Sequence, residues 1–261
     1  MRADNHFTPA ERRTCMRGSE DSKEVIVQLE DITRSFGDLT VLDGISLEFA
    51  TDEVTAIVGP NGSGKTTLLR VVAGVLGSDG GSRRVPIETE RPIGYLPQDP
   101  RFRTQFSVDE TLTYYGDLLK ASVDVEASME QVGLLDVRDR RVGQLSGGMR
   151  RLLGIAQSLL GDPPVVVLDE PTSGLDPRMR EHVFDIVGDI ASEETTVVLS
   201  SHDLAGATRT DYVVLLDSGT VRRAGTPREL IDAGPNDSLT AAFLDSIPDG
   251  PAVQTGTRGE S

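Results

Sequence analysis

A glycine-rich octapeptide fits the pattern GxxxxGK[ST]: Gly59-Pro60-Asn61-Gly62-Ser63-Gly64-Lys65-Thr66. Glycines let backbone N–H groups turn inward around phosphate oxygens, and a following helix points its positive N-terminal end at the same place. In such a loop Lys65 would reach the β and γ phosphates of a nucleotide, and the Thr66 hydroxyl would hold Mg²⁺. The octapeptide therefore predicts a phosphate-binding site.

The residues on either side of the octapeptide support this interpretation. The apolar run at 54–58 is typical of a strand buried on both faces of a sheet, and residues 65–76 follow with a helical pattern. Lysine occurs at only three positions in the chain, which are 23, 65 and 120, so its presence inside the loop carries weight.

A second apolar run, residues 165–168, ends in Asp169 and Glu170. A strand would deliver Asp169 to the carboxyl edge of a sheet, where a carboxylate can hold hydrated Mg²⁺. Glu170 lies one residue further on and points differently, so it could polarise an attacking water. On this run alone, a strand that merely ends in surface acids remains an open alternative, because the whole chain is acidic.

The rest of the chain alternates strand and helix patterns. Strands are expected at residues 25–29, 45–49, 93–96, 196–200 and 212–216, with weak strand content within 77–90, and helices at residues 109–120, 125–133 and 147–160. In the last helix the apolar residues share one face: Met149, Leu152, Leu153, Ala156, Leu159 and Leu160. This alternation predicts an α/β fold with a covered, mostly parallel sheet.

Several further short motifs occur in a fixed order along the chain. They are Ser35-Phe36-Gly37, the octapeptide, Gln98, Leu145-Ser146-Gly147-Gly148-Met149, Asp169-Glu170, Ser173-Gly174-Leu175-Asp176 and Ser201-His202-Asp203. In these motifs and their spacing the chain resembles the ABC (ATP-binding cassette) ATPases over residues 24–245. The resemblance implies a P-loop NTPase (RecA-like) core with an antiparallel β subdomain and an inserted α-helical subdomain.

The resemblance also implies a role for each motif. ATP would be bound by Phe36 through its adenine, by residues 59–66 and Thr67 through its phosphates, and across a dimer interface by Ser146, Gly147, Gly148 and Asp176. Mg²⁺ would be held by Thr66, Gln98 and Asp169. The catalytic residues would be Glu170, His202, Gln98 and Lys65, with His202 contacting the γ-phosphate.

Such a site needs partner proteins. Because its phosphate ligands come from two chains, a second copy of this chain or a paralogous ATPase subunit is expected, with ATP holding the pair together. No stretch of the sequence comes close to the roughly 18 consecutive apolar residues that a membrane-spanning helix needs. An integral membrane permease would therefore be a separate protein. Cys15 is the only cysteine, which fits a reducing cytoplasm, and we expect the subunit at the cytoplasmic face of the cell membrane.

Two features of the sequence favour one branch of the family. The run Gly94-Tyr95-Leu96-Pro97-Gln98, and Met149 where the family most often has Gln, look most like the cassettes of ABC-2-type exporters. An importer's ATPase is the main alternative, since the same catalytic parts serve both directions. A soluble, non-transport ABC ATPase fits less well with a single cassette and one cysteine.

The domain boundaries follow from the same patterns. Residues 24–246 would form the ABC ATPase domain, with its core at 24–98 and 161–246 and the helical subdomain at 99–160. Residues 1–23 are predicted to be a disordered leader, in which Met16 could be an alternative start, and residues 247–261 a flexible tail. Phe102 and Phe106 are candidate contacts for the membrane partner, or could equally pack inside the helical subdomain.

The charge of the chain bears on its partners and its environment. The net charge is -16, with 42 Asp and Glu spread along the sequence against 26 Lys and Arg. This balance disfavours nucleic-acid binding, which needs basic patches. Dispersed carboxylates with scarce lysine are typical of proteins from salt-accumulating halophiles, in which salt screens the self-repulsion. An ordinary acidic protein is the alternative.

The halophile interpretation leads to a testable prediction. Folding and ATPase activity should require about molar salt, because only then is the repulsion among the carboxylates screened over a few ångströms. Circular dichroism and phosphate release across a series of KCl concentrations measure both properties. Full activity at low ionic strength would count against the interpretation.

Overall fold

The computed structural model describes residues 23–119, 123–192, 195–233 and 238–246. The strands are β1 Val25–Phe36, β2 Leu39–Ala50, β3 Val54–Val58, β4 Gly80–Arg84, β5 Ile93–Leu96, β6 Val165–Leu168, β7 Thr196–Ser201, β8 Tyr212–Asp217 and β9 Thr220–Gly225. The helices are α1 Lys65–Val72, α2 Val108–Gly116, α3 Val125–Gln131, α4 Gly147–Leu159, α5 Pro177–Ser192, α6 Leu204–Ala207, α7 Pro227–Asp232 and α8 Leu239–Ser246, with 3₁₀ turns η2 Leu135–Val137 and η3 Val142–Gln144.

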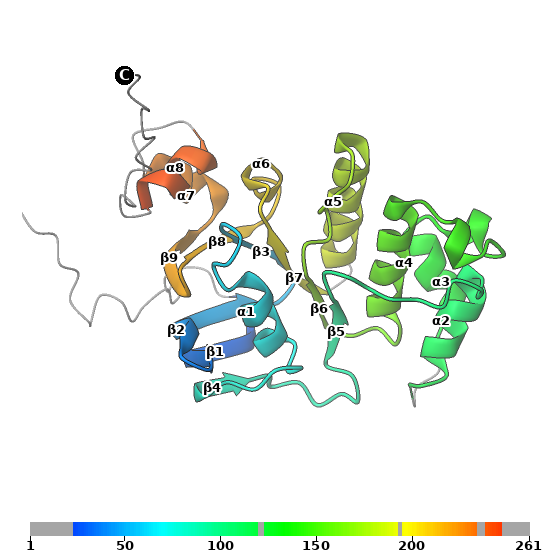
Figure 1. Cartoon of the computed structure of the whole chain (residues 1–261), viewed down its shortest axis with the longest axis horizontal. Helices are drawn as coiled ribbons and strands as arrows, with labels where there is room; N and C mark the ends of the chain where they lie inside the picture. Colours follow the sequence, from blue (N-terminus) through cyan, green and yellow to red (C-terminus); the bar gives the residue numbers. More distant parts are fainter. Residues whose placement is uncertain (1–22, 120–122, 193–194, 234–237, 247–261) are drawn as a thin grey trace, which may run out of the picture.

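These strands form two sheets. The six-stranded sheet has the order β5-β6-β7-β3-β8-β9, in which only the β8–β9 pair is antiparallel. The three-stranded sheet is antiparallel, with the order β2-β1-β4. Figure 1 shows β1, β2 and β4 below the larger sheet, and α2, α3 and α4 together beyond β5. The predicted fold class, an α/β core with an antiparallel β subdomain and an inserted helical subdomain, is confirmed.

The predicted strands differ from the observed ones mainly in length. The apolar runs at 54–58, 93–96 and 165–168 have the predicted bounds as β3, β5 and β6. Strands β1 and β2 are longer than predicted, because their pairing continues to Phe36 and Leu39 at the hairpin end. Strand β9 was not predicted; it folds back on β8 through Ser218 and Gly219, both at positive φ.

The predicted helices also need correction at their ends. The helix expected over 65–76 ends at Val72, and Gly74 then adopts a φ of 72°, which a helix cannot continue. The helix expected over 109–120 begins at Val108, after a capping box formed by Ser107 and Glu110, and is shorter, ending at Gly116. The predicted leader and tail fall, apart from residue 23, outside the described residues.

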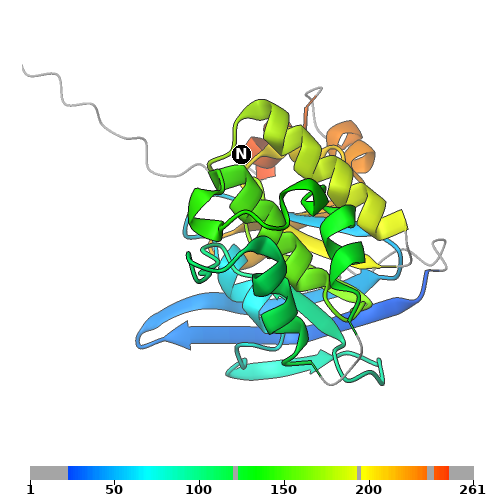
Figure 2. The same cartoon turned by 90° about the vertical axis from the view of Figure 1, so that its right-hand side faces the viewer.

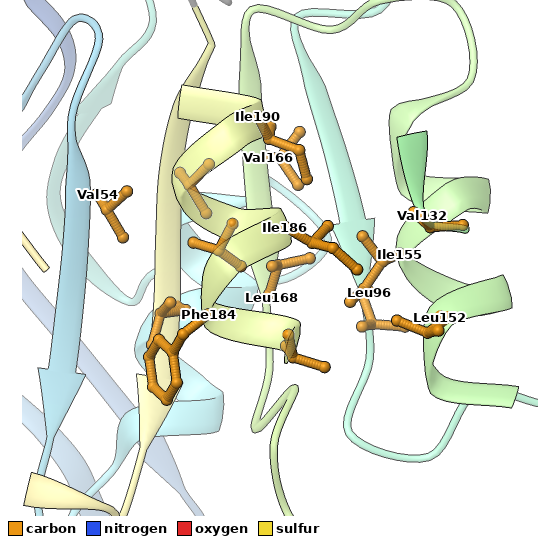
Figure 3. Packing of buried hydrophobic residues seen from close by; sticks show 14 of the residues in the cluster. Val54, Leu96, Val132, Leu152, Ile155, Val166, Leu168, Phe184, Ile186 and Ile190 are labelled. Atoms are coloured by element: carbon orange, nitrogen blue, oxygen red, sulfur yellow. The ribbon is translucent and has the colours of Figure 1, made fainter. Parts of the chain in front are cut away.

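The hydrophobic core lies on both faces of the larger sheet. Strands β3, β6 and β7 are buried at every residue, as expected of central strands covered on both sides. Figure 3 looks into the face covered by α4 and α5, where Ile186 of α5 lies near Leu168 of β6, and Ile155 of α4 lies against Leu96 of β5. Each fully buried side chain of this kind stabilises the fold by about 1.5–3 kcal/mol, so α4 is held firmly against β5.

Helices α2, α3 and α4 form a layer of their own. Figure 2 turns this layer toward the viewer, with the three-stranded sheet along its lower side. Their buried apolar residues Leu112, Met129 and Leu153 belong to the same cluster as the α5 face of the sheet. The layer is therefore packed on the core and is not a detached lobe.

The topology brings distant residues to one edge. The parallel strands β3, β5, β6 and β7 all end at this edge of the sheet. Gly59 follows β3, Gln98 lies just beyond β5, Asp169 follows β6, and His202 follows β7. In open α/β sheets ligands bind outside the carboxyl ends of the strands, so this edge is where a site is expected.

Candidate active site

The glycine-rich loop makes a tight turn between β3 and α1. Gly64 precedes the first residue of α1 and adopts a φ of 102°, a backbone conformation that favours glycine. A Cβ on Gly64 would also lie 2.9 Å from the Val41 carbonyl oxygen. The first N–H groups of a helix lack partners within the helix. The loop therefore presents the N-terminal end of α1 to an anion.

Lys65 is the cation of this loop. Its Nζ donates hydrogen bonds to the carbonyl oxygens of Gly59 at 2.8 Å and Pro60 at 3.1 Å. The same Nζ lies 3.6 Å from Oε1 of Glu170, and both side chains are buried. The ammonium group thus joins the glycine loop to the acidic end of β6.

Asp169 contacts Thr66, the residue that follows Lys65. Its Oδ1 accepts hydrogen bonds from the Thr66 hydroxyl at 3.1 Å and the Ser200 hydroxyl at 2.8 Å. Its Oδ2 is buried and has no hydrogen-bond partner. Burial raises the pKa of Asp169, and the charge of Glu170 adds to this, whereas the hydrogen bonds from Ser200 and Thr66 oppose it.

The free carboxylate oxygen and the Thr66 hydroxyl fit a hard cation such as Mg²⁺. Buried polar atoms without partners are rare in folded proteins, and one beside a hydroxyl needs an explanation. Among the described residues, no group of three or more His, Cys, Asp or Glu side chains could hold a metal ion. Mg²⁺ accepts a site with few protein ligands, because it keeps waters and nucleotide phosphates in its coordination shell.

Glu170 has an unusual backbone conformation. Its φ is 51°, a left-handed value that costs about 1–3 kcal/mol for a residue other than glycine. Its N–H donates to the Ser200 hydroxyl at 2.8 Å, and its Oε2 lies 2.8 Å from Nδ1 of His202. The carboxylate is buried, whereas the His202 ring is 53% exposed. Glu170 therefore lies between Lys65 and a histidine that reaches the surface.

Three further predicted residues lie on other elements, Phe36 at the end of β1, Ser146 at the start of α4 and Asp176 just before α5. Ser146 is exposed and caps α4, accepting a hydrogen bond from the N–H of Met149 at 3.2 Å. Asp176 is exposed and caps the start of α5 through the N–H of Met179. Phe36 is 49% exposed, with the Arg34 guanidinium 4.9 Å from its ring centroid.

Gln98 is exposed at the turn after β5, and its carbonyl oxygen accepts a hydrogen bond from Nη1 of Arg151 at 2.9 Å. Neither Arg151 nor Ser200 was predicted as a site residue. Ser200 could have been noticed as a polar residue inside the buried run of β7. Arg151 gave no such signal, because it is one of two adjacent arginines on a predicted helix.

A glycine loop between a parallel strand and a helix, facing an acidic strand end, defines the P-loop class of nucleotide-binding proteins. Within that class, the family model of ABC transporters matches residues 42–173. The chain belongs to the ABC transporter family of ATP-binding subunits. It binds and hydrolyses ATP as the ATPase subunit of a transporter.

Similar proteins are known from several bacteria. The chain is 33% identical over 223 residues to the Nod factor export ATP-binding protein I of Rhizobium sp. (strain N33), covering 80% of this chain and 73% of that protein. It is 35% identical over 214 residues to the uncharacterized ABC transporter ATP-binding protein YxlF of Bacillus subtilis (strain 168), covering 78% and 72%.

Solved structures share the fold. The ADP conformation of MJ1267, an ATP-binding cassette of an ABC transporter, has a TM-score of 0.73 at 25% identity and covers 85% of this chain and 98% of that one. The structure of cbiO1 from Clostridium perfringens has a TM-score of 0.72 at 26% identity and covers 80% and 92%. None of the described helices is long and apolar enough to cross a bilayer.

Proposed function

We propose that this subunit hydrolyses Mg²⁺-bound ATP between two cassettes and thereby drives a separate membrane permease, in the direction of export, from the cytoplasmic face of the membrane. The observation that carries the chemistry is the cluster at the sheet edge. Glu170 lies buried between Lys65 and His202, and the free Oδ2 of Asp169 lies beside the Thr66 hydroxyl.

Each side chain has a chemical task in this proposal. Lys65 and the loop N–H groups bind the β and γ phosphates, which places the terminal phosphorus for attack. Glu170 accepts the proton of the attacking water as a general base, and His202 contacts the γ-phosphate. Asp169, Thr66 and Gln98 would hold Mg²⁺, which neutralises phosphate charge when bound.

The exposure of the residues at the start of α4 supports a partner cassette. Ser146 and Gly147 are exposed at the start of α4, a 13-residue helix whose positive end suits an anion. We propose that Ser146, Gly147 and Gly148 bind the γ-phosphate held by a second copy or a paralogous subunit, with Asp176 at the same interface.

Export is supported by the names of the relatives. Several similar proteins are named Nod factor export ATP-binding protein I, including that of Rhizobium sp. (strain N33). The adjacent reading frame offers a direct test of direction. A membrane protein with the six helices of the ABC-2 type would support export, whereas a gene for a periplasmic-type binding protein would favour import and contradict this part of the proposal.

A pocket of about 410 Å³ just beyond Gln98 is the proposed docking place for the permease. It is lined by Arg101, Phe102, Arg103, Phe106, Thr111, Tyr114, Tyr115 and Leu118. Ring pairs line it, with centroids 6.3 Å apart for Phe102 and Tyr115 and 6.2 Å for Phe106 and Tyr114. Aromatic residues and arginine are enriched where partners bind, and the guanidinium groups suit a segment that carries carboxylates. cbiO1, which shares this fold, is described as part of the transporter complex cbiONQ.

Removing two rings tests the docking place. The double change Phe102→Ala and Phe106→Ala should weaken assembly with the permease about tenfold or more, because central aromatic residues contribute much of the binding energy. Co-purification in detergent measures assembly, and the ATPase activity and Tm of the free subunit show that it still folds. Leu244→Ala is the control, since Leu244 is 65% exposed on α8, and Figure 1 shows α8 at the other end of the molecule from α2. Unchanged assembly in a stable double variant would contradict the docking proposal.

A further inference from the structure

Arg151 connects two parts of the site, the start of α4 and the turn after β5 that holds Gln98. It lies on α4, five residues after Ser146, so it shares a rigid helix with the residues proposed to face the second subunit. Its Nη1 donates a hydrogen bond of 2.9 Å to the carbonyl oxygen of Gln98, at the exit of β5. A guanidinium group donates through a planar fork, and a charged donor makes a stronger bond than a neutral one.

A second contact between α4 and this segment lies one turn further along the helix. A Cβ on Gly154 would approach Leu96 Cδ1 to 2.5 Å and Pro100 Cγ to 3.5 Å. The helix backbone is therefore pressed against the residues on both sides of Gln98. Arg151 and Gly154 are three residues apart and so lie on the same face of α4. Two contacts on one face leave little freedom between α4 and the Gln98 turn.

The charged groups around Arg151 include carboxylates of the proposed active site at the sheet edge. Its side chain is half-buried, and burial lowers the pKa of its guanidinium, against the raising effects of Asp169, Asp99 and Glu170. Two of these three carboxylates are the proposed metal ligand and the proposed general base. The cation thus lies in the field of the same groups that act on ATP, although it makes no direct bond to them.

We propose that Arg151 is a positioning residue, which transmits the placement of the Ser146 end of α4 to the Gln98 turn and so to the metal end of the site. When the start of α4 meets the second subunit, a rigid helix moves Arg151, and the hydrogen bond carries the Gln98 backbone with it. The inference rests on the proposed roles of Ser146 and Gln98. It assigns to Arg151 a part in assembling the site, and no contact with ATP.

Three variants separate this role from simple packing. Arg151→Met keeps an unbranched side chain but cannot donate, and Arg151→Lys keeps a charge and an N–H donor group. Arg150→Met is the matched control, because Arg150 is the exposed neighbour on the same helix. We expect Arg151→Met to lower kcat about tenfold, the value of one charged hydrogen bond, with the KM for ATP unchanged because the glycine loop is intact. Arg151→Lys should recover part of kcat, and Arg150→Met should behave as the unmodified protein.

A second readout concerns the pairing of two cassettes. With Glu170→Gln as the background, Arg151→Met should raise the ATP concentration needed for dimerisation, and Arg150→Met should not. The inference is overturned if Arg151→Met keeps its kcat, if its KM rises while kcat stays, or if Lys and Met variants lose activity only in proportion to a lower Tm. Failure of the proposed function is a different result: the unmodified protein would then lack Mg²⁺-dependent hydrolysis, or Glu170→Gln would hydrolyse ATP normally.

Discussion

Glu170→Gln is expected to slow ATP hydrolysis by about a hundredfold or more, the usual contribution of a positioned general base. The amide has the same shape but cannot accept the proton of the attacking water. ATP binding should persist, because the loop and Lys65 are unchanged. Since ATP then stays whole between the two cassettes, the variant should also accumulate as an ATP-bound dimer.

Phosphate release measures the first effect, and size-exclusion chromatography with and without ATP measures the second. Glu181→Gln is the matched control, because Glu181 is an exposed carboxylate on α5, a helix that begins just after the site. It should change neither result. A Glu170→Gln protein that hydrolyses ATP at the normal rate would refute the assignment of the base.

Asp169→Asn is expected to abolish Mg²⁺-dependent hydrolysis and, in the absence of nucleotide, to raise the Tm by a few degrees. The pKa of Asp169 is raised by burial above its value in the unfolded chain. The folded state therefore prefers the protonated carboxyl, and stability is lost as the pH rises through the folded-state pKa. A neutral amide of the same shape avoids that loss, while giving up the oxygen proposed to hold Mg²⁺.

Calorimetry over a range of pH separates this effect from others. The Tm advantage of Asp169→Asn should be largest near neutral pH and should vanish in acid, where the Asp169 carboxyl is itself neutral. Asp189→Asn, an exposed carboxyl on α5, should leave both Tm and activity unchanged. A Tm for Asp169→Asn below that of the unmodified protein at neutral pH would contradict the prediction.

The sequence predicts those strands whose local pattern is strong enough to stand alone. Strands β3, β5 and β6 are short apolar runs bounded by glycine, proline or acidic residues, and their bounds agree with the structure. Strand β4 reads Gly80-Gly81-Ser82-Arg83-Arg84, which has no apolar alternation, and it is a strand only because it pairs with β1. Such pairing joins residues far apart in the chain, and no local window contains it.

The residues of the candidate site likewise fall into two groups, those within a local sequence pattern and those that depend on contacts between distant residues. The loop residues and Asp169 could be found because each follows an apolar strand within a recognisable motif. Arg151 could not, since its role depends on a contact that spans 53 residues. Ser200 stood out only as a polar residue within the β7 run, and its partner Asp169 lies 31 residues away. The sequence also gave no sign that one oxygen of Asp169 has a partner pair and the other none, because burial of single atoms depends on packing.

The left-handed backbone of Glu170 has an evolutionary consequence. Glycine or asparagine at that position would relieve the backbone strain, which offsets part of the loss of the buried contacts to Lys65 and His202, yet either would remove the carboxylate. The cost to folding of losing this carboxylate is thus reduced, and selection for turnover becomes the main force that keeps it. In a transporter built from two different ATPase subunits, one of the two sites could decay at a reduced cost to folding, leaving a pair with one working centre.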